Sequence, residues 1–248
     1  MNNTKLALVL ALILMVTCNI SKALALDERQ EEEYNRARIL LTEEKTEEAR
    51  TIFSMLAKEA PLDLKVRLGL IDTTIEEGRI LKFNKLDGWK SKIYAAFGEL
   101  KAIFRANATS PEIYLSFAKC YWLNNRFQKA DKSLKKAFYY KPGYPEAYLL
   151  KGDMYFDKSK ESNIDPFNES ESQGESEQRR KIAIESYEKA LIGITDSYTQ
   201  SMVNYKLGEL YAYFRNHNKG KDYFEKAVSI ASNSYWAEKS KQKLVELK

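Results

Sequence analysis

Residues 111–142 have the sequence PEIYLSFAKCYWLNNRFQKADKSLKKAFYYKP. At 100° per residue, four side chains of its first half fall on one helical face: Tyr114, Phe117, Ala118 and Tyr121. Three side chains of its second half also share one helical face: Ala130, Leu134 and Ala137. Asn124 and Asn125 favour a turn between the halves, and Pro142 ends the second helix. The stretch therefore predicts a helical hairpin whose helices cross closely where Ala118 and Ala130 are small.

Counted from Pro111 as position 1, these residues lie at positions 4, 7, 8, 11, 20, 24, 27 and 32. This pattern resembles the tetratricopeptide repeat at its eight signature positions. A later unit repeats the spacing with Leu207, Gly208, Tyr211, Gly220, Phe224 and Ala227. Recurrence at a fixed period indicates a repeat architecture, in which each unit buries its apolar face against its neighbours.

Three further units match the pattern less completely. The unit before the last opens with Pro145 and Gly152 and resumes at Ala183, after about 19 extra residues. The first unit is carried by Ala37, Ala49 and Phe53, and the second, the weakest, by Leu68-Gly69 and Ala96. Five hairpins are thus expected between Leu26 and Asn233, and residues 234–248 form an amphipathic cap. The resemblance implies an all-α, right-handed superhelix (α-solenoid) over residues 26–248.

Two insertions interrupt this repeat domain. Near residues 76–92, apolar side chains recur at helical spacing, which predicts a lengthened hairpin with a helix start at Asp87-Gly88. Aromatic residues beside Lys82, Lys85 and Lys90 are compatible with a nucleic-acid-binding patch, but the favoured interpretation is that these aromatic residues pack within the lengthened hairpin. Near residues 157–180 the chain is acidic and rich in serine, which favours a solvated loop and leaves open an acidic contact for a basic partner.

The first 25 residues have the pattern of an export signal. Lys5 precedes an apolar run over residues 6–16, which is too short to span a bilayer, and Ala23-Leu24-Ala25 has the small-x-small form of a cleavage site. We therefore expect export to the periplasm or cell envelope. Two alternatives attach the chain to the membrane: an uncleaved anchor, or a lipoprotein lipidated at Cys18, although Thr17 makes a poor lipobox.

The composition argues against an enzyme. The 248 residues contain one histidine, His217, and two cysteines, so nucleophilic or zinc chemistry has few candidate side chains. No catalytic, cofactor or metal site is predicted. Without the two lysines of residues 1–25, the net charge falls from +5 to +3, which is too mild to indicate nucleic-acid binding. Cys120 is then the remaining thiol, and we expect it to pack inside a helix pair.

A second face of each hairpin's first helix lines the concave groove in proteins that this pattern resembles. In the third unit this face holds Leu115, Lys119 and Trp122. In the next two units, the corresponding positions are Leu149, Phe156 and Tyr205, with Tyr213 adjacent. These seven are the predicted partner-binding residues. For Trp122 and Phe156, packing between repeats is the alternative.

The resemblance implies a non-enzymatic scaffold that binds other proteins. Together with the export signal, it predicts a protein–protein interaction scaffold of the bacterial cell envelope that holds a partner segment in its groove. The alternative is an envelope protein that binds a small ligand or glycan by stacking on aromatic groove residues. The identity of the partner does not follow from the sequence.

Overall fold

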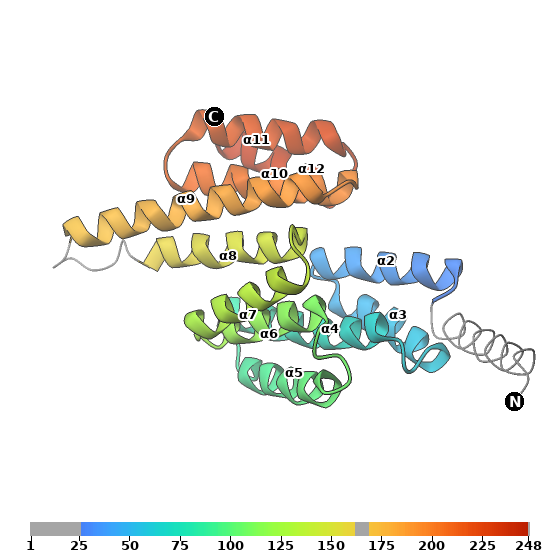
Figure 1. The fold of residues 1–248 in the computed structure, drawn as a ribbon. Coiled ribbons are helices and arrows are strands. Elements are labelled where there is room, and N and C mark those ends of the chain that lie inside the picture. The colour runs from blue at the N-terminus through green and yellow to red at the C-terminus, as the bar shows by residue number, and fades with distance from the viewer. Residues whose placement is uncertain (1–25, 162–168, 248) are drawn as a thin grey trace, which may run out of the picture. The chain divides into compact units, whose positions relative to one another are not determined.

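The computed structural model describes residues 26–161 and 169–247, which form helices joined by short connections and include no strand (Figure 1). In chain order the helices are α2 (Glu28–Thr42), α3 (Thr46–Glu59), α4 (Leu64–Phe83), α5 (Trp89–Phe104), α6 (Pro111–Leu123), α7 (Phe127–Tyr140), α8 (Pro145–Glu161), α9 (Glu169–Gly193), α10 (Ser197–Tyr213), α11 (His217–Ile230) and α12 (Tyr235–Glu246). In chain order they make five successive pairs followed by α12, as predicted, and α4 and α5 pack less closely than the other four pairs. The predicted export signal, with Cys18, lies outside the described residues.

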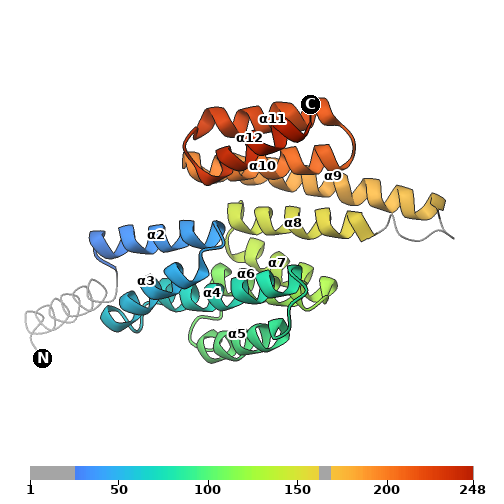
Figure 2. The same ribbon diagram turned by 180° about the vertical axis from the view of Figure 1, so that it is seen from behind.

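The chain divides into two compact units between Ile103 and Phe104. The N-terminal unit contains α2 to α4 and nearly all of α5, and the C-terminal unit contains α6 to α12. In the N-terminal unit, α3 packs against both α2 and α4. In the C-terminal unit, α8 lies beside α9 and α10 beside α11, as Figure 2 shows from behind. None of the described helices combines the length and hydrophobicity that a membrane crossing requires.

The first helix of four hairpins, and the final helix, begin with the same kind of cap. Aspartate or serine precedes the helix, and its side-chain oxygen accepts a hydrogen bond from the backbone N–H three residues later. The capping residues are Asp27, Asp63, Ser110, Asp196 and Ser234. Each cap satisfies a backbone donor that has no partner within its helix. These residues therefore fix where each first helix starts.

Four of the hairpin turns share one backbone conformation. In each, a residue other than glycine adopts a positive φ of 56° to 63° after the first helix: Glu44, Lys85, Asn125 and Arg215. The N–H groups of this residue and of the next return to carbonyls of the last helical turn, as when Lys85 donates to Lys82 and Leu86 to Leu81. This is the Schellman arrangement, which satisfies carbonyls at the helix end and reverses the chain.

Small residues allow the helices of the C-terminal unit to approach closely. A β-carbon added at Gly208 of α10 would lie 2.6 Å from the ring of Phe224 on α11, which is fully buried. Gly152 lies in the same way against the ring of Tyr187 on α9. In the third hairpin, Ala118 and Leu134 occupy the corresponding positions within one buried cluster. Where the first helix has a glycine, the second helix packs an aromatic ring against it, and where the first helix has an alanine, the second helix has a leucine.

The first insertion lengthens the second hairpin. Helix α4 has 20 residues and α6 has 13, and the difference is about two helical turns. Helix α5 begins at Trp89, directly after Gly88, whose φ is +89°. At this position a glycine is favoured, because side chains rarely adopt a positive φ.

The interpretation of residues 157–180 as a loop is wrong for the part that the structure describes. Helix α8 continues to Glu161, and α9 already begins at Glu169, so helix occupies both ends of the acidic insertion. Ser159 and Ser176 are buried where the two helices meet, and the Ser176 hydroxyl donates to the Ser159 carbonyl at 2.9 Å. Because these contacts are made by small polar residues, they leave no apolar period in the sequence.

Candidate functional site

The C-terminal unit contains a pocket of about 280 Å³ on the face predicted to bind a partner. Successive first helices supply most of its wall, and α12 takes the place of a further first helix. The lining residues are Phe156 and Lys160 of α8, Glu209, Ala212 and Tyr213 of α10, Phe224 of α11, and Lys243, Glu246 and Leu247 at the end of the chain. This site is called the groove pocket below.

Two aromatic rings and an ammonium group form one corner of the groove pocket. The rings of Phe156 and Tyr213 meet edge to face, with their centroids 5.8 Å apart. The Nζ atom of Lys160 lies 3.8 Å from the Phe156 centroid and 5.6 Å from that of Tyr213. Phe156 is 9% exposed, whereas Tyr213 is 48% exposed. Tyr213 is therefore the ring that a partner can reach, and the buried Phe156 ring packs against it.

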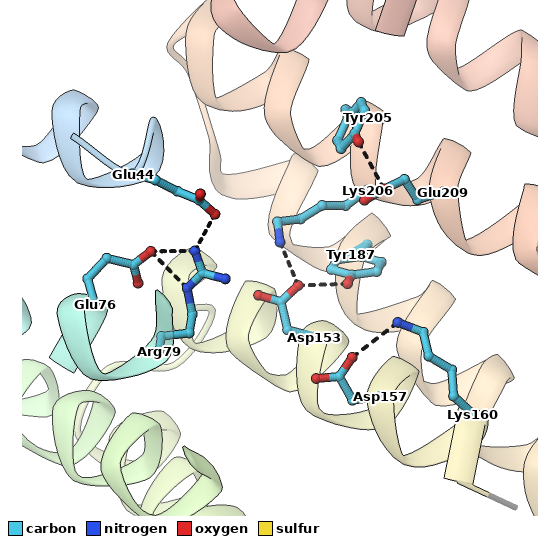
Figure 3. A network of polar contacts seen from close by, with 10 residues as sticks. All are labelled: Glu44, Glu76, Arg79, Asp153, Asp157, Lys160, Tyr187, Tyr205, Lys206 and Glu209. Carbon is cyan, nitrogen blue, oxygen red and sulfur yellow. Dashed lines mark hydrogen bonds and ion pairs between the residues drawn. The ribbon is translucent and has the colours of Figure 1, made fainter. Parts of the chain in front are cut away.

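Polar contacts hold the helices behind this corner in place (Figure 3). The Asp153 carboxylate of α8 accepts hydrogen bonds at 2.8 Å from the Tyr187 hydroxyl and from the Lys206 ammonium. These contacts join α8 to α9 and to α10. Burial, with the negative charge of Asp153, raises the pKa of Tyr187 well above its ordinary value, so the phenol remains a donor at neutral pH.

Asp157 lies one helical turn beyond Asp153 and forms an ion pair with Lys160 at 3.2 Å. Burial raises the pKa of Asp157, and the positive charge of Lys160 opposes this effect. The ion pair therefore keeps the Lys160 ammonium above the two rings and offsets part of the cost of burying the carboxylate.

Glu209 is the acidic side chain of the groove pocket that no cation neutralises within the described residues. Its Oε1 atom accepts a hydrogen bond from the Tyr205 hydroxyl at 2.9 Å, and it takes part in no ion pair there. Burial and the nearby Glu209 raise the pKa of Tyr205. By contrast, Glu246 pairs with Lys243 at 2.8 Å. The groove pocket thus offers one carboxylate beside an exposed aromatic ring.

The structure brings only two of the seven predicted binding residues to the groove pocket, Phe156 and Tyr213. Leu115 is 5% exposed within the core shared by the third and fourth hairpins, and Trp122 packs against the same core. Tyr205 is 7% exposed, and its ring packs against Phe224 and Trp236.

The remaining two predicted residues are half-buried elsewhere. Leu149 lies against the cluster that contains Phe156, and Lys119 lies on α6. Most of the predicted set therefore has little surface to offer a partner, because a neighbouring helix covers the same face.

Seven of the nine lining residues lie outside the predicted binding set. Of these, Lys160 falls in the predicted acidic loop, and Lys243, Glu246 and Leu247 fall in the predicted C-terminal cap. A signal for the last three was present, because α12 continues the repeat spacing. Lys243 and Glu246 follow Ser234 by the same intervals that separate Glu209 and Ala212 from Gln200.

A second pocket of about 420 Å³ lies on α2 and α3 in the N-terminal unit. Its charged residues largely pair with one another, as Arg29 does with Glu59 and Arg36 with Glu33. These pairs leave it less suited to a charged partner than the groove pocket. Within residues 26–161 and 169–247, no three His, Cys, Asp or Glu side chains are grouped so that they could hold a metal ion.

The helix pairs α6–α7 and α10–α11 coincide with matches to a known sequence family. The model of the tetratricopeptide repeat matches residues 111–144 and 203–234. Residues 111–144 and 203–234 are tetratricopeptide repeats. No curated protein matches the chain.

Solved structures of other proteins share this fold. One is TTC0263, a thermophilic TPR protein of Thermus thermophilus, with 16% identity and a TM-score of 0.61; the match covers 88% of this chain and 98% of that one. Another is in the hetero-tetramer Cut9-Hcn1 of the APC/C, with 14% identity and a TM-score of 0.56 over 88% of this chain and 36% of that one. The predicted fold class, an all-α solenoid of tetratricopeptide-like hairpins, is confirmed. At these identities the likeness shows the fold alone.

Proposed function

We propose that this chain is a non-enzymatic scaffold that binds a segment of another protein in the groove pocket. The fold supports an interaction role, because stacked hairpins present long surfaces to partners. The observation that carries the proposal is the pairing of an exposed aromatic ring, Tyr213, with the Glu209 carboxylate, which has no cationic partner among the described residues. An aromatic anchor beside an unpaired charge is typical of a protein-binding hot spot.

The chemistry of the groove pocket selects a basic partner segment. Glu209 would pair with an arginine or lysine of the partner, and the stem of that side chain would lie along Tyr213. The Lys160 ammonium already lies over the Phe156 ring, with Nζ 3.8 Å from the ring centroid, so an ammonium group fits beside the aromatic rings of this corner. The bound segment therefore combines a cation with neighbouring apolar residues.

Removing the Glu209 charge should weaken partner binding. We expect Glu209→Gln to reduce affinity about tenfold, because a charge-assisted hydrogen bond is replaced by a neutral one. The measurement is affinity purification from a cell-envelope extract on the immobilised chain, followed by titration with the purified partner. Glu225→Gln is the matched control, since Glu225 is an exposed glutamate on α11, where it pairs with Lys221. Equal affinities for the two variants would place the binding site elsewhere.

The same experiment distinguishes the alternative of a small ligand or glycan. If that alternative holds, the immobilised chain captures no protein from the extract. It binds a glycan instead, and Tyr213→Ala abolishes that binding. A retained protein whose affinity falls in Glu209→Gln but not in Glu225→Gln favours the scaffold.

We also propose that the chain is exported to the cell envelope and cleaved after Ala25. Support comes from Lys5, the apolar run over residues 6–16 and Ala23-Leu24-Ala25. We expect mass spectrometry of the native protein to find an N-terminus at Leu26. A lipid on Cys18 would replace cleavage with lipoprotein anchoring, and an intact Met1 in the membrane fraction would indicate an uncleaved anchor.

A further inference from the structure

The turn between α4 and α5 exposes apolar side chains among lysines. Phe83 and Leu86 are each 54% exposed, and Trp89 is half-buried. Three lysines lie in the same short stretch: Lys82, Lys85 and Lys90. The expectation that these apolar residues pack within the lengthened hairpin is therefore wrong for Phe83 and Leu86. The six residues named here are called the hairpin tip below.

The backbone of this turn does not require an apolar residue at its end. In the Schellman turns of the other hairpins, the residue equivalent to Leu86 is Lys45, Arg126 or Asn216. All three are polar, and their turns have the same hydrogen bonds. Phe83 and Leu86 therefore add exposed apolar area at this tip that the turn itself does not need.

The charges at the hairpin tip are arranged around its aromatic rings. The ammonium groups of Lys82 and Lys90 lie 5.2 Å and 5.5 Å from the Trp89 centroid. Lys85 and Lys90 form no ion pair with any described residue. Arg79, which lies over Phe83, differs because its guanidinium pairs with Glu44 and Glu76 (Figure 3). Positive charge is therefore available at the tip itself, beside the exposed apolar residues.

We propose that the hairpin tip contacts the headgroup region of an anionic phospholipid bilayer. Phe83 and Leu86 would enter the boundary of the acyl chains, Trp89 would lie at headgroup depth, and the lysines would face the lipid phosphates. The apolar side chains match the acyl-chain layer of such a bilayer, and the neighbouring lysines match its layer of anionic headgroups. Nucleic acid fits less well, because Leu86 has no role on a phosphate backbone and lysines already lie against the Trp89 ring.

Trp89 itself provides the test. The chain has three tryptophans, so replacing Trp122 and Trp236 with Phe leaves Trp89 as the single reporter in the full chain. Its fluorescence is measured with vesicles whose lipids carry brominated acyl chains, which quench tryptophan on contact. We expect quenching with phosphatidylcholine vesicles that contain phosphatidylglycerol, and loss of quenching in high salt or with phosphatidylcholine alone. This signal reports the tip even if residues 1–25 also attach the chain to the vesicles.

Matched variants separate the apolar and the charged contributions. We expect Phe83→Ser with Leu86→Ser to lower the apparent partition coefficient about tenfold, because the exposed apolar area is lost. Leu62→Ser with Ile192→Ser is the control, since these residues are 72% and 86% exposed elsewhere on the chain. Lys85→Glu should also weaken the contact, and the fold tolerates glutamate there, as Glu44 has the same backbone conformation in the first turn.

Three results would overturn the proposal. The first is vesicle binding without quenching of Trp89, which would mean that another segment holds the chain while the tip stays in water. The second is equal loss of quenching in the tip and control variants. The third is a response of Trp89 to a single- or double-stranded oligonucleotide with none to anionic vesicles, which would assign the lysines to nucleic acid.

Discussion

Replacing Gly208 with Ala is expected to lower the free energy of unfolding of the C-terminal unit by about 2–3 kcal/mol, towards the upper end of overpacking costs. In most helices this change stabilises by about 1 kcal/mol, because glycine is the poorer helix former. Here the added methyl group would lie 2.6 Å, 2.7 Å and 3.0 Å from three ring atoms of Phe224. That ring is fully buried and cannot turn away, so a helix or its neighbour must shift. The measurement is urea unfolding followed by circular dichroism.

A control and a rescue make this prediction specific. Gly98→Ala should stabilise the chain, since nothing lies within 4 Å of the added carbon on the exposed side of α5. Adding Phe224→Leu to Gly208→Ala copies the pair Ala118 and Leu134 of the third hairpin. We expect the double variant to be at least about 1 kcal/mol more stable than the sum of the single effects. Additive effects would mean that the ring does not limit the space at Gly208.

The hairpins were predictable because their cores depend on local spacing. Aromatic and small residues recur at fixed intervals in the third and fifth units, and a helix converts those intervals into one packed face. The same rule located Phe156 and Tyr213 on the side that holds the groove pocket. Features that one helix and its turn determine could therefore be derived from the sequence.

Features that depend on the next hairpin could not be derived in this way. Leu115 and Tyr205 are on the expected side of their helices, but neighbouring helices bury them. Ser159 and Ser176 extend a helix pair through small polar contacts that have no hydrophobic period. The neighbouring helix decides whether a side chain at such a position is exposed, and the periodicity of a single helix does not reveal which helix will be its neighbour.

Glu77 of α4 joins three helices of the N-terminal unit, so its loss should have a large effect. Its Oε1 atom accepts hydrogen bonds from the Arg50 Nε and Nη2 atoms of α3 at 2.8 Å and 2.6 Å, and its Oε2 atom accepts one from Lys92 Nζ of α5 at 2.7 Å. The side chain of Glu77 is only 10% exposed. Glu77→Gln would turn an amide donor towards these cations while preserving shape. We expect this to lower the free energy of unfolding by about 2–3 kcal/mol at neutral pH. The exposure of Arg50 and Lys92, 34% and 45%, keeps the cost below that of a fully buried pair.

The pH dependence of that loss identifies its cause. Burial alone would raise the pKa of Glu77, but the hydrogen bonds from Lys92 and Arg50 outweigh it, and the pKa lies below its ordinary value. A carboxylate with a lowered pKa stabilises the fold above its ordinary pKa, and this contribution is lost as the pH falls through the folded-state value. Urea unfolding should therefore show a large difference between wild type and Glu77→Gln at neutral pH, and a much smaller one in acid. Glu99→Gln, at an exposed site on α5, should change stability little at either pH. A difference for Glu77→Gln that persists unchanged in acid would assign the loss to packing instead of charge.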